Sequence, residues 1–328
     1  MGSIVCSKVS QGHIIENKAL SKDFYLMKVD LGVGAGAPIR PGRFFMLRSW
    51  GTEPVLSRPI SVFDADGATV SFLYKVVGRG TKLFSGLKPG DAITCDGPHG
   101  NGFPDNPAGD AAGVSAHDGT AGESGGGTTG DCGGDTTGDA AGVSAHDGKA
   151  GESGGGTTGD CAWDTTGDCT GDCAGDTTAK HIGRTKIAMV GGGVGIAPFY
   201  LACKVYRGLY PDMRLDVYLG FSDEGILIKE YMDVADKVTV NVGGFVTDDV
   251  DAAQYDAILT CGPEIMMRVL YQKYLASGSG AQFHVSMENR MACGIGACLV
   301  CTCKNKSGNK KACKDGPVFP GHEVFGFA

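Results

Sequence analysis

Residues 186–207 read KIAMVGGGVGIAPFYLACKVYR, and this stretch decides the fold class. The short apolar run Lys186–Val190 leads into the glycine-rich segment 191–198, and a helical stretch follows at Ile196–Arg207. A strand, a tight glycine turn and a helix in this order are typical of a dinucleotide-binding unit. The pattern continues with strands predicted at Leu215–Phe221, Val238–Val242 and Ala257–Thr260 and a helix at Glu264–Ala276. Strands that alternate with helices indicate an α/β domain with a parallel sheet.

The glycine segment departs from the usual G-x-G-x-x-G pattern, because Pro198 occupies the third glycine position. Asp216 begins its strand, so no acidic residue stands at a strand end about 20 residues on. The absence of an evident basic cluster for a 2′-phosphate favours NADH over NADPH. A second loop, 261–264 (CGPE), also joins a strand to a helix and would reach the same edge of the sheet. The predicted NAD-binding residues are Gly193, Gly195, Ala197, Pro198, Cys261, Gly262 and Pro263.

Residues 1–103 have the rhythm of an all-β domain. Six β-rich runs are separated by turn signals such as Asp66-Gly67. They lie at Ile4–Ile15, Phe24–Leu31, Phe44–Ser49, Pro59–Phe63, Thr69–Val77 and Ala92–Cys95. Six short strands over about 100 residues predict a six-stranded antiparallel barrel.

This barrel carries a candidate flavin site. The sequence RPIS at 58–61 joins two strands, and GRGT at 78–81 opens a short helix. A guanidinium beside a glycine-rich helix start suits a pyrophosphate, and a serine hydroxyl could hydrogen-bond a flavin ring. An arginine ion pair on the barrel rim is the alternative for RPIS alone. The predicted FAD-binding residues are Arg58, Pro59, Ile60, Ser61, Leu73, Tyr74, Lys75, Gly80 and Thr81.

The C-terminal residues 284–328 contain the most specific chemical motif. Four cysteines are spaced C-x4-C-x2-C-x11-C, namely Cys293, Cys298, Cys301 and Cys313. This is the plant-type ferredoxin spacing for a 2Fe–2S cluster held by four thiolates. The small, glycine-rich loop 292–298 lets backbone amides turn toward the cluster sulfurs. A structural zinc site is the alternative, although it prefers two closely spaced cysteine pairs. Cys303 is predicted to be a buried or spare thiol.

Residues 104–185 interrupt this plan with a Gly/Asp-rich repeat. The 29-residue stretch 109–137 recurs at 138–166 with three substitutions, and a partial copy follows at 167–178. The repeat holds 21 glycines, 13 acidic residues and one basic residue, and this composition predicts a disordered insert. A calcium-binding solenoid is the alternative. Its four cysteines are interpreted as passengers of the duplication.

Composition limits the remaining function classes. No apolar run has the roughly 20 residues of a spanning helix, and no secretory signal is visible at the start, so we expect a cytoplasmic protein without membrane contact. In a reducing compartment the 13 cysteines are expected to be metal ligands or thiols. The net charge of −8 gives no support to nucleic-acid binding. The scattered His99, His181, His284 and His322 form no evident acid–base constellation.

Taken together, these motifs resemble the ferredoxin–NADP reductase superfamily. The segments LSRPISVF, LYKVVGRGT, GPHGNGF, VGGGVGIAP, CGPEIMM and MENRMACGIGACLVCTCK look more narrowly like the electron-transfer subunit of type B dihydroorotate dehydrogenase. The resemblance covers 1–103 and 186–328, and the repeat has no counterpart in it. Position 60 is Ile where many flavin reductases carry an aromatic residue, and the family it resembles also uses an aliphatic one.

The resemblance implies a function. An FMN-containing catalytic partner would oxidise dihydroorotate, and electrons would pass through the 2Fe–2S cluster and FAD to NAD+ in pyrimidine (UMP) biosynthesis. It implies an assembly of two copies of each subunit. Arg58 would hold the FAD pyrophosphate, Ser61 would contact the ring, and Cys261 would stand near the nicotinamide. The implied domains are an FAD barrel (1–103), the insert (104–185), an NAD domain (186–283) and a cluster domain (284–328).

Two other functions stay open at this point. The small subunit of a sulfide dehydrogenase or of an NADPH–ferredoxin transhydrogenase has a similar order of cofactors. From a different class, the chain could be an acidic calcium-binding or interaction module that acts through its repeat.

Overall fold

The structure, a computed structural model, describes residues 8–32, 38–109 and 184–327. The predictions for residues 110–183, namely a disordered insert, a calcium-binding solenoid and passenger cysteines, lie outside the described residues, as does His181. Within the described part, no helix is both long and apolar enough to cross a membrane.

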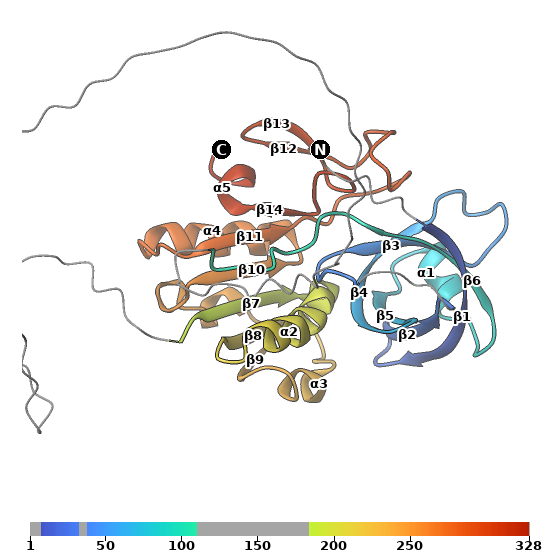
Figure 1. Cartoon of the computed structure of the whole chain (residues 1–328), viewed down its shortest axis with the longest axis horizontal. Coiled ribbons are helices and arrows are strands. Elements are labelled where there is room, and N and C mark those ends of the chain that lie inside the picture. Colours follow the sequence, from blue (N-terminus) through green and yellow to red (C-terminus); the bar gives the residue numbers. More distant parts are fainter. Residues whose placement is uncertain (1–7, 33–37, 110–183, 328) are drawn as a thin grey trace, which may run out of the picture. The chain divides into compact units, whose positions relative to one another are not determined.

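The N-terminal part is a closed antiparallel barrel with the strand order β1-β2-β5-β4-β3-β6 (Figure 1). Its strands are β1 (Lys8–Ala19), β2 (Phe24–Asp30), β3 (Phe44–Arg48), β4 (Arg58–Asp66), β5 (Thr69–Lys75) and β6 (Ala92–His99). The short helix α1 (Arg79–Phe84) follows β5, as the glycine-rich segment predicted. Apolar side chains from alternate strand positions, such as Met27, Phe45 and Phe72, fill the interior. The predicted six-stranded barrel is confirmed.

The second part is a six-stranded sheet with the order β14-β11-β10-β7-β8-β9. All neighbouring strands are parallel except β14, which pairs antiparallel to β11. The strands are β7 (Lys186–Gly192), β8 (Arg214–Phe221), β9 (Lys237–Val242), β10 (Ala257–Cys261), β11 (Gln282–Ser286) and β14 (Val318–Pro320). The predicted parallel sheet is confirmed, and the sequence analysis missed β11 and β14.

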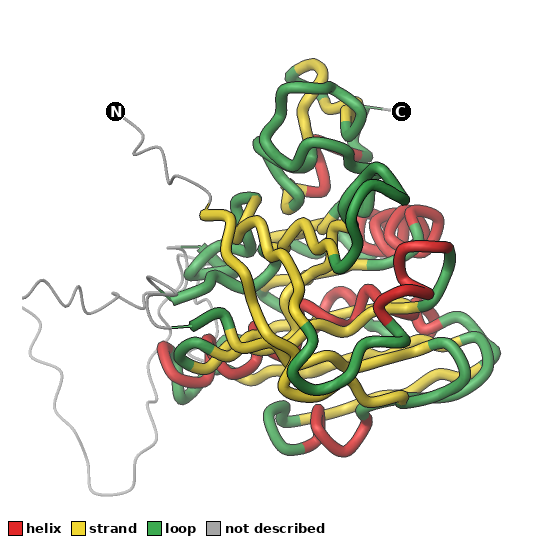
Figure 2. Tube along the Cα trace, turned by 90° about the vertical axis from the view of Figure 1, so that its right-hand side faces the viewer, coloured by secondary structure: helices red, strands yellow, loops and turns green. Residues whose placement is uncertain are grey.

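Helices cover both faces of this sheet. On one face α2 (Ala197–Leu209) and α3 (Ile228–Met232) pack on one set of alternate strand residues, and on the other face α4 (Glu264–Ala276) and α5 (Gly321–Val324) pack on the opposite set. Figure 1 shows α2 and α4 on opposite sides of the strands, and Figure 2 shows the same trace turned by 90°, with helices in red and strands in yellow. Burial on both faces explains why β7 and β10 are continuous apolar runs.

The cysteine-rich segment is anchored to this sheet at both ends. It begins after β11, which spans the predicted domain limit at 283/284, and it returns as β14. Between them lies the hairpin of β12 (Thr302–Asn305) and β13 (Gly308–Lys311), which contacts α5. Pairing between β11 and β14 therefore fixes where the cysteine loops lie.

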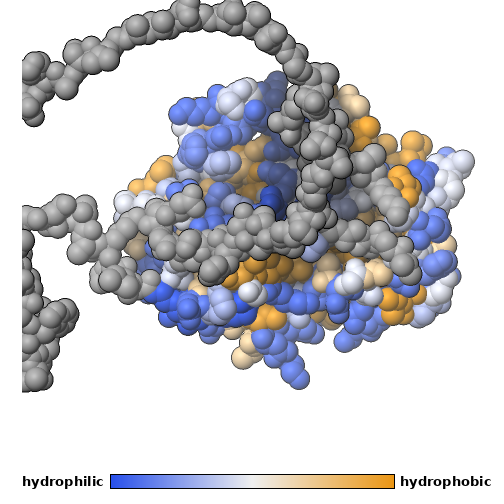
Figure 3. Space-filling model, viewed as in Figure 1, coloured by the Kyte–Doolittle hydropathy of each residue, from blue (hydrophilic) through white to orange (hydrophobic). Residues whose placement is uncertain are grey.

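The barrel packs directly on α2. The rings of Phe63 and Tyr200 stack with centroids 4.4 Å apart, and Phe103 stacks on Phe199 at 5.7 Å. Lys204 Nζ lies 2.7 Å from Asp64 Oδ1 beside them. On the face drawn in Figure 3, hydrophobic residues occur in separate patches among hydrophilic ones. The contact with α2 places the barrel against the end of the glycine loop, where α2 begins.

Candidate functional site

A cavity of about 350 Å³ is lined jointly by the barrel, the glycine loop and the segment that leads into the cysteines. Eight of the nine residues predicted to bind FAD line it, namely Arg58, Pro59, Ile60, Ser61, Leu73, Tyr74, Lys75 and Thr81. The ninth, Gly80, lies against the Arg58 side chain. The structure thus brings together residues from β4, β5 and α1 that the sequence had grouped by motif alone.

The guanidinium of Arg58 is held between Gly80 and Trp50. A Cβ atom at Gly80 would lie 2.5 Å from Arg58 Nε, and Arg58 Cζ lies 5.5 Å from the centroid of the Trp50 ring. Arg58 Nη1 also donates a hydrogen bond to the Leu56 carbonyl at 2.5 Å. A cation over an indole face is attracted by the ring quadrupole. The guanidinium is therefore fixed beside the first turn of α1 by the chain itself.

Two further barrel side chains form a rigid wall. The Thr81 hydroxyl accepts hydrogen bonds from the backbone N–H groups of Val77 (3.0 Å) and Gly78 (3.2 Å), which fixes the turn before α1. Tyr74 stacks on Tyr25 at 5.5 Å and donates to Asn17 Oδ1 at 3.1 Å. Burial raises the pKa of Tyr74, so the phenol stays protonated. Both residues serve as wall and support, with their polar atoms already paired.

The two predicted nicotinamide loops touch each other. The glycine loop forms a single 3-10 turn, Gly193–Ile196, and its Val194 lines the cavity together with Ala197 of α2. A Cβ atom at Gly195 would lie 2.5 Å from the Cys261 carbonyl oxygen. Gly262, at φ +140°, packs with similar closeness against Gly192. Only glycine permits this approach, so the two loops form one surface at the carboxyl edge of the sheet.

Pro198 lies in the first turn of α2, where its missing N–H has no partner to lose. This position explains the departure from the usual glycine pattern. The proline starts the helix, and the close contact is supplied by Gly195 one turn earlier.

Cys261 ends β10 and lies behind the cavity wall. Its side chain is buried, and its thiol donates to Glu288 Oε1 at 3.8 Å. Burial first, and then the charge of Glu288, raise the pKa of Cys261 well above that of a free thiol. The pKa of Glu288 is likewise raised by burial, against the opposing effect of the thiol hydrogen bond. Glu288 lines the cavity, so Cys261 is connected to it through that carboxyl group.

Sequence reasoning missed one wall of the cavity. That wall is made by residues at the end of β11 and just after it, namely Ser286, Met287, Glu288, Asn289, Arg290 and Met291. Phe44, Val77, Val194 and Pro317 complete the lining. The segment MENRM had been noticed as part of the resemblance, but its residue types carry no motif of their own. Their place in the cavity wall follows from the position of β11 in the sheet.

The four predicted cluster cysteines form two pairs. The sulfur atoms of Cys301 and Cys313 lie 3.2 Å apart, and the Cys313 N–H donates to Cys301 Sγ at 3.4 Å. Cys293 pairs with Cys298, whose backbone and side chain both donate to it together with the Ile295 N–H. Burial opposes ionisation of Cys293, but these hydrogen bonds lower its pKa to about 6. Cys293 is thereby favoured as a thiolate, the form that binds metal, whereas burial and then the neighbouring Cys301 raise the pKa of Cys313 in the metal-free chain.

The surrounding loop also fits a cluster. Gly294 (φ +72°), Gly296 (φ +83°) and Leu299 (φ +60°) adopt left-handed backbone conformations around the sulfur atoms. Across residues 8–32, 38–109 and 184–327, no three His, Cys, Asp or Glu side chains are grouped so as to hold one metal ion. Two thiolate pairs suit a 2Fe–2S cluster, in which each iron takes two thiolates. The Cys303 thiol instead donates to the Lys310 carbonyl at 3.6 Å from within an apolar core.

The described histidines lie away from the cavity wall. His99 is buried with Nε2 3.2 Å from Asp96 Oδ1, and burial lowers the pKa of His284. Neither these nor His322 line the cavity. None of these three histidines therefore contributes a side chain to the cavity.

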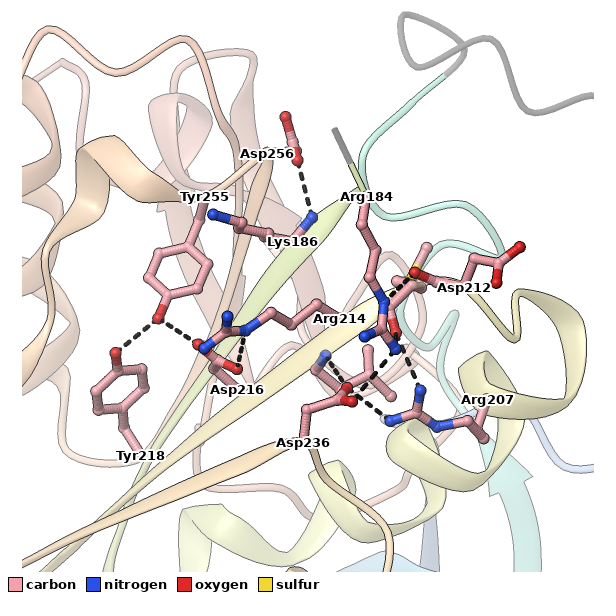
Figure 4. Close-up of polar contacts among 12 residues, drawn as sticks. Arg184, Lys186, Arg207, Asp212, Arg214, Asp216, Tyr218, Asp236, Tyr255 and Asp256 are labelled. Carbon is pink, nitrogen blue, oxygen red and sulfur yellow. Dashed lines mark hydrogen bonds and ion pairs between the residues drawn. The ribbon is translucent and has the colours of Figure 1, made fainter. Parts of the chain in front are cut away.

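A second polar cluster occupies the opposite edge of the sheet, where β8 begins (Figure 4). Asp216 accepts from Arg214 Nε at 2.9 Å and from the Tyr255 hydroxyl at 3.0 Å, and the hydroxyls of Tyr255 and Tyr218 lie 2.6 Å apart. Ligands of parallel sheets bind at the carboxyl edge, not at this one. Asp216 is therefore a structural carboxylate, which agrees with its exclusion as a ribose ligand.

Comparison with known proteins identifies relatives of this chain. Residues 288–325 match the model of the iron–sulfur cluster binding domain of dihydroorotate dehydrogenase B. The electron transfer subunit of dihydroorotate dehydrogenase B (NAD(+)) from Clostridium acetobutylicum is 33% identical over 293 residues, covering 87% of this chain and 86% of the relative. The subunit of the same name from Clostridium perfringens is 32% identical over 321 residues, covering 96% and 97%.

Solved structures show the same fold at lower identity. An NADH-dependent reduced ferredoxin–NADP oxidoreductase aligns with a TM-score of 0.64 at 22% identity, covering 95% of this chain and 89% of that one. A cytochrome P450 reductase from Amycolatopsis aligns with a TM-score of 0.54 at 15% identity, covering 85% and 69%. On the strength of its curated relatives, the chain belongs to the family of electron transfer subunits of dihydroorotate dehydrogenase B.

Proposed function

We propose that this chain is the electron transfer subunit of a dihydroorotate dehydrogenase, and that it carries electrons from the FMN of a catalytic partner through a 2Fe–2S cluster and FAD to NAD+. The oxidation of dihydroorotate to orotate, a step of pyrimidine (UMP) biosynthesis, belongs to the partner. One observation carries the proposal. A single cavity is lined by the flavin motif, by the glycine loop and by the segment that runs into the cluster cysteines.

The barrel residues would hold FAD along one wall of this cavity. Arg58 would pair with the pyrophosphate in bidentate fashion, since its guanidinium is already fixed beside α1. Gly80 and Thr81 would bind phosphate or ribose through their backbone, since the Thr81 hydroxyl is already paired, and Ser61 would contact the ring. Leu73, Tyr74 and Lys75 would line the nucleotide side, and Pro59 and Ile60 would complete the wall next to Ser61.

The touching loops would receive NAD+ at the carboxyl edge of the sheet. Gly193, Gly195, Ala197 and Pro198 would take the pyrophosphate. Cys261, Gly262 and Pro263 would lie near the nicotinamide, with Glu288 between the thiol and the cavity. A bound flavin supplies the change from single electrons to a hydride that NAD+ accepts. The chain's part is to hold both ligands in one cavity.

The cluster segment would complete the path. Met291 lines the cavity and also packs with Cys301 and Cys313 in one small apolar core. The Cys301–Cys313 pair is therefore separated from the flavin cavity by about one side chain. Cys293, Cys298, Cys301 and Cys313 would each give one thiolate to the 2Fe–2S cluster.

The partner would dock over the exposed side of the cysteine loop. Cys298 is exposed, and Ile295, Leu299 and Val300 around it are 57%, 62% and 53% exposed. Exposed apolar side chains next to a redox centre suit a subunit interface. The proposed assembly contains two copies of this chain and two of the FMN subunit. The limits 1–103, 104–185, 186–283 and 284–328 remain the proposed domains.

Co-expression with the FMN subunit followed by anaerobic purification tests the function. The complex should contain FAD, FMN and about two irons per copy of this chain, and it should reduce NAD+ when dihydroorotate is added. A colourless preparation that contains zinc would overturn the cluster assignment. A complex with all cofactors but no dihydroorotate-dependent NAD+ reduction would overturn the substrate.

A further inference from the structure

The turn that leaves the barrel after β6 is joined to the cluster segment by one side chain, that of Asn101. Its Oδ1 accepts from the Val318 N–H at 3.1 Å, and its Nδ2 donates to the Val318 carbonyl at 2.7 Å. Its own backbone N–H donates to the Gly316 carbonyl at 2.7 Å. The side-chain amide thus pairs with both backbone groups of one residue, as a neighbouring strand would.

The two segments are in close contact at this point. Gly100 has φ +82°, and a Cβ atom there would lie 2.5 Å from Pro317 Cδ and 2.9 Å from the Gly316 oxygen. No larger residue fits without moving one segment away from the other. The glycine therefore allows Asn101 to reach Val318.

The segment that Asn101 holds connects the two redox sites. Cys313, a proposed cluster ligand, lies three residues before Gly316, and Pro317 lines the flavin cavity. The Pro317 carbonyl also accepts from the Met287 N–H at 2.9 Å, which ties the segment to the opposite cavity wall. A shift of this segment would move a cluster ligand relative to the flavin.

The other contacts between barrel and cluster segment are mainly apolar. Phe44 and Met46 pack with Cys301, Ala312 and Cys313. Apolar contacts are non-directional and tolerate sliding, whereas paired hydrogen bonds fix a register. Asn101 therefore supplies the directional contact across this boundary.

We propose that Asn101 is a positioning residue that fixes the cluster segment against the barrel and so sets the separation between the 2Fe–2S cluster and the flavin. This inference rests on the proposed function, because it assumes that both cofactors bind where described above. Asn101 touches neither cofactor. Its effect is on the electron step between them.

The test is Asn101→Ala in the full chain, with Asn106→Ala as the matched control. Within residues 8–32, 38–109 and 184–327, the Asn106 side chain bonds to the nearby Gly109 carbonyl, at 3.0 Å, and to no part of the cluster segment. FAD and iron content and the NADH-dependent reduction of ferricyanide by the flavin should be unchanged in both variants. Reduction of the cluster by NADH, followed by stopped-flow absorbance without the partner, should slow about tenfold or more in Asn101→Ala only.

Two structural readouts accompany the kinetics. Amide hydrogen exchange at Val318 should accelerate in Asn101→Ala, since its N–H loses the Oδ1 acceptor. Pulsed electron paramagnetic resonance on the partly reduced chain should show a broader range of cluster–flavin distances. If the substitution only destabilised the fold, the chain would bind less cofactor, and the cluster–flavin distance would not change.

The isosteric Asn101→Asp provides a second variant, because it keeps the acceptor but loses the donation to Val318. It should slow cluster reduction with both cofactors bound. The inference would be overturned if Asn101→Ala left both the rate of cluster reduction and the distance distribution unchanged. Loss of FAD or iron in both Asn101→Ala and Asn101→Asp would also overturn it. Failure of the proposed function looks different: the wild-type chain and its partner would then give no dihydroorotate-dependent NAD+ reduction, while NADH would still reduce the cluster.

Discussion

Gly80→Ala should weaken FAD binding without weakening the fold. A Cβ atom at position 80 would lie 2.5 Å from Arg58 Nε, 2.7 Å from Cζ and 2.9 Å from Nη2. Real Cβ contacts are not this short, so the guanidinium must leave its place over Gly80. It is the end of a flexible side chain, and it can therefore move toward solvent while α1 and the barrel stay as they are. The added methyl group also raises the helix propensity of α1 by about 1 kcal/mol.

The size of the effect follows from the lost contact. A hydrogen bond to a charged group contributes about 1.5–3 kcal/mol. Because 1.4 kcal/mol corresponds to a factor of ten, loss of the Arg58 contact should raise the Kd for FAD by roughly 10- to 150-fold. Arg58→Ala should have a similar effect. Combining the two substitutions should add little to either one, because both remove the same contact.

Titration of the flavin-free chain with FAD, followed by flavin fluorescence, measures this. Gly78→Ala is the control, since a Cβ there has nothing within 4 Å and the backbone is extended at φ −172°. It should leave the Kd unchanged. An unaltered Kd for FAD in Gly80→Ala would refute the proposed role of Gly80 in placing the Arg58 guanidinium. So would a double variant in which the effects of Gly80→Ala and Arg58→Ala on this Kd add fully.

Three further predictions concern the cluster, the repeat and the sheet. Cys298→Ser should lose iron and dihydroorotate-dependent NAD+ reduction but keep FAD, whereas Cys303→Ser should keep all three; iron analysis and turnover assays decide. Deletion of 109–178 should leave FAD content, iron content and NAD+ binding unchanged, and loss of NAD+ binding in calorimetry would contradict this. Asp236→Asn should lower the melting temperature at pH 7, because burial alone would raise the pKa of Asp236 but the Leu215 N–H and Arg207 hold it below its ordinary value. The stabilisation by ionised Asp236 is complete above about pH 4 and is lost as pH falls through the lowered pKa. The difference in melting temperature between wild type and Asp236→Asn should therefore vanish in acid. A difference that persists there would refute this assignment.

The sequence predicted the parts whose signal is local. The strand before Gly191, the helix that follows it and the turn at 78–81 each carry their own residue preferences, and all three were found. The flavin residues were found because RPIS and GRGT are short motifs on adjacent elements. Their convergence on one cavity needs the barrel to close, which no local pattern encodes.

What the sequence did not predict depends on pairing between distant segments. β14 is three residues long, and it exists because β11 offers it hydrogen-bond partners. The cavity wall at 286–291 has no chemical motif, and its residues matter only because β11 ends beside the glycine loop. Asn101 was read as part of a family motif with no role, since its partner lies 217 positions away. Non-local contacts of this kind leave no periodicity in a single sequence.

The residues just before and just after the repeat explain why this fold tolerates the insertion. Before the repeat, Tyr206 donates to the Pro104 carbonyl at 2.8 Å, and Arg40 lies 2.5 Å from Asp105. After it, Arg184 bonds to Asp236, directly before β9 (Figure 4). Each flank is therefore held by the folded part independently of the residues between them. For the flexible stretch that the sequence predicts, each doubling of length between fixed ends costs only about 0.6 kcal/mol. Duplication of a 29-residue unit at this place thus leaves the barrel, the sheet and the cluster segment in the contacts on which the electron path depends.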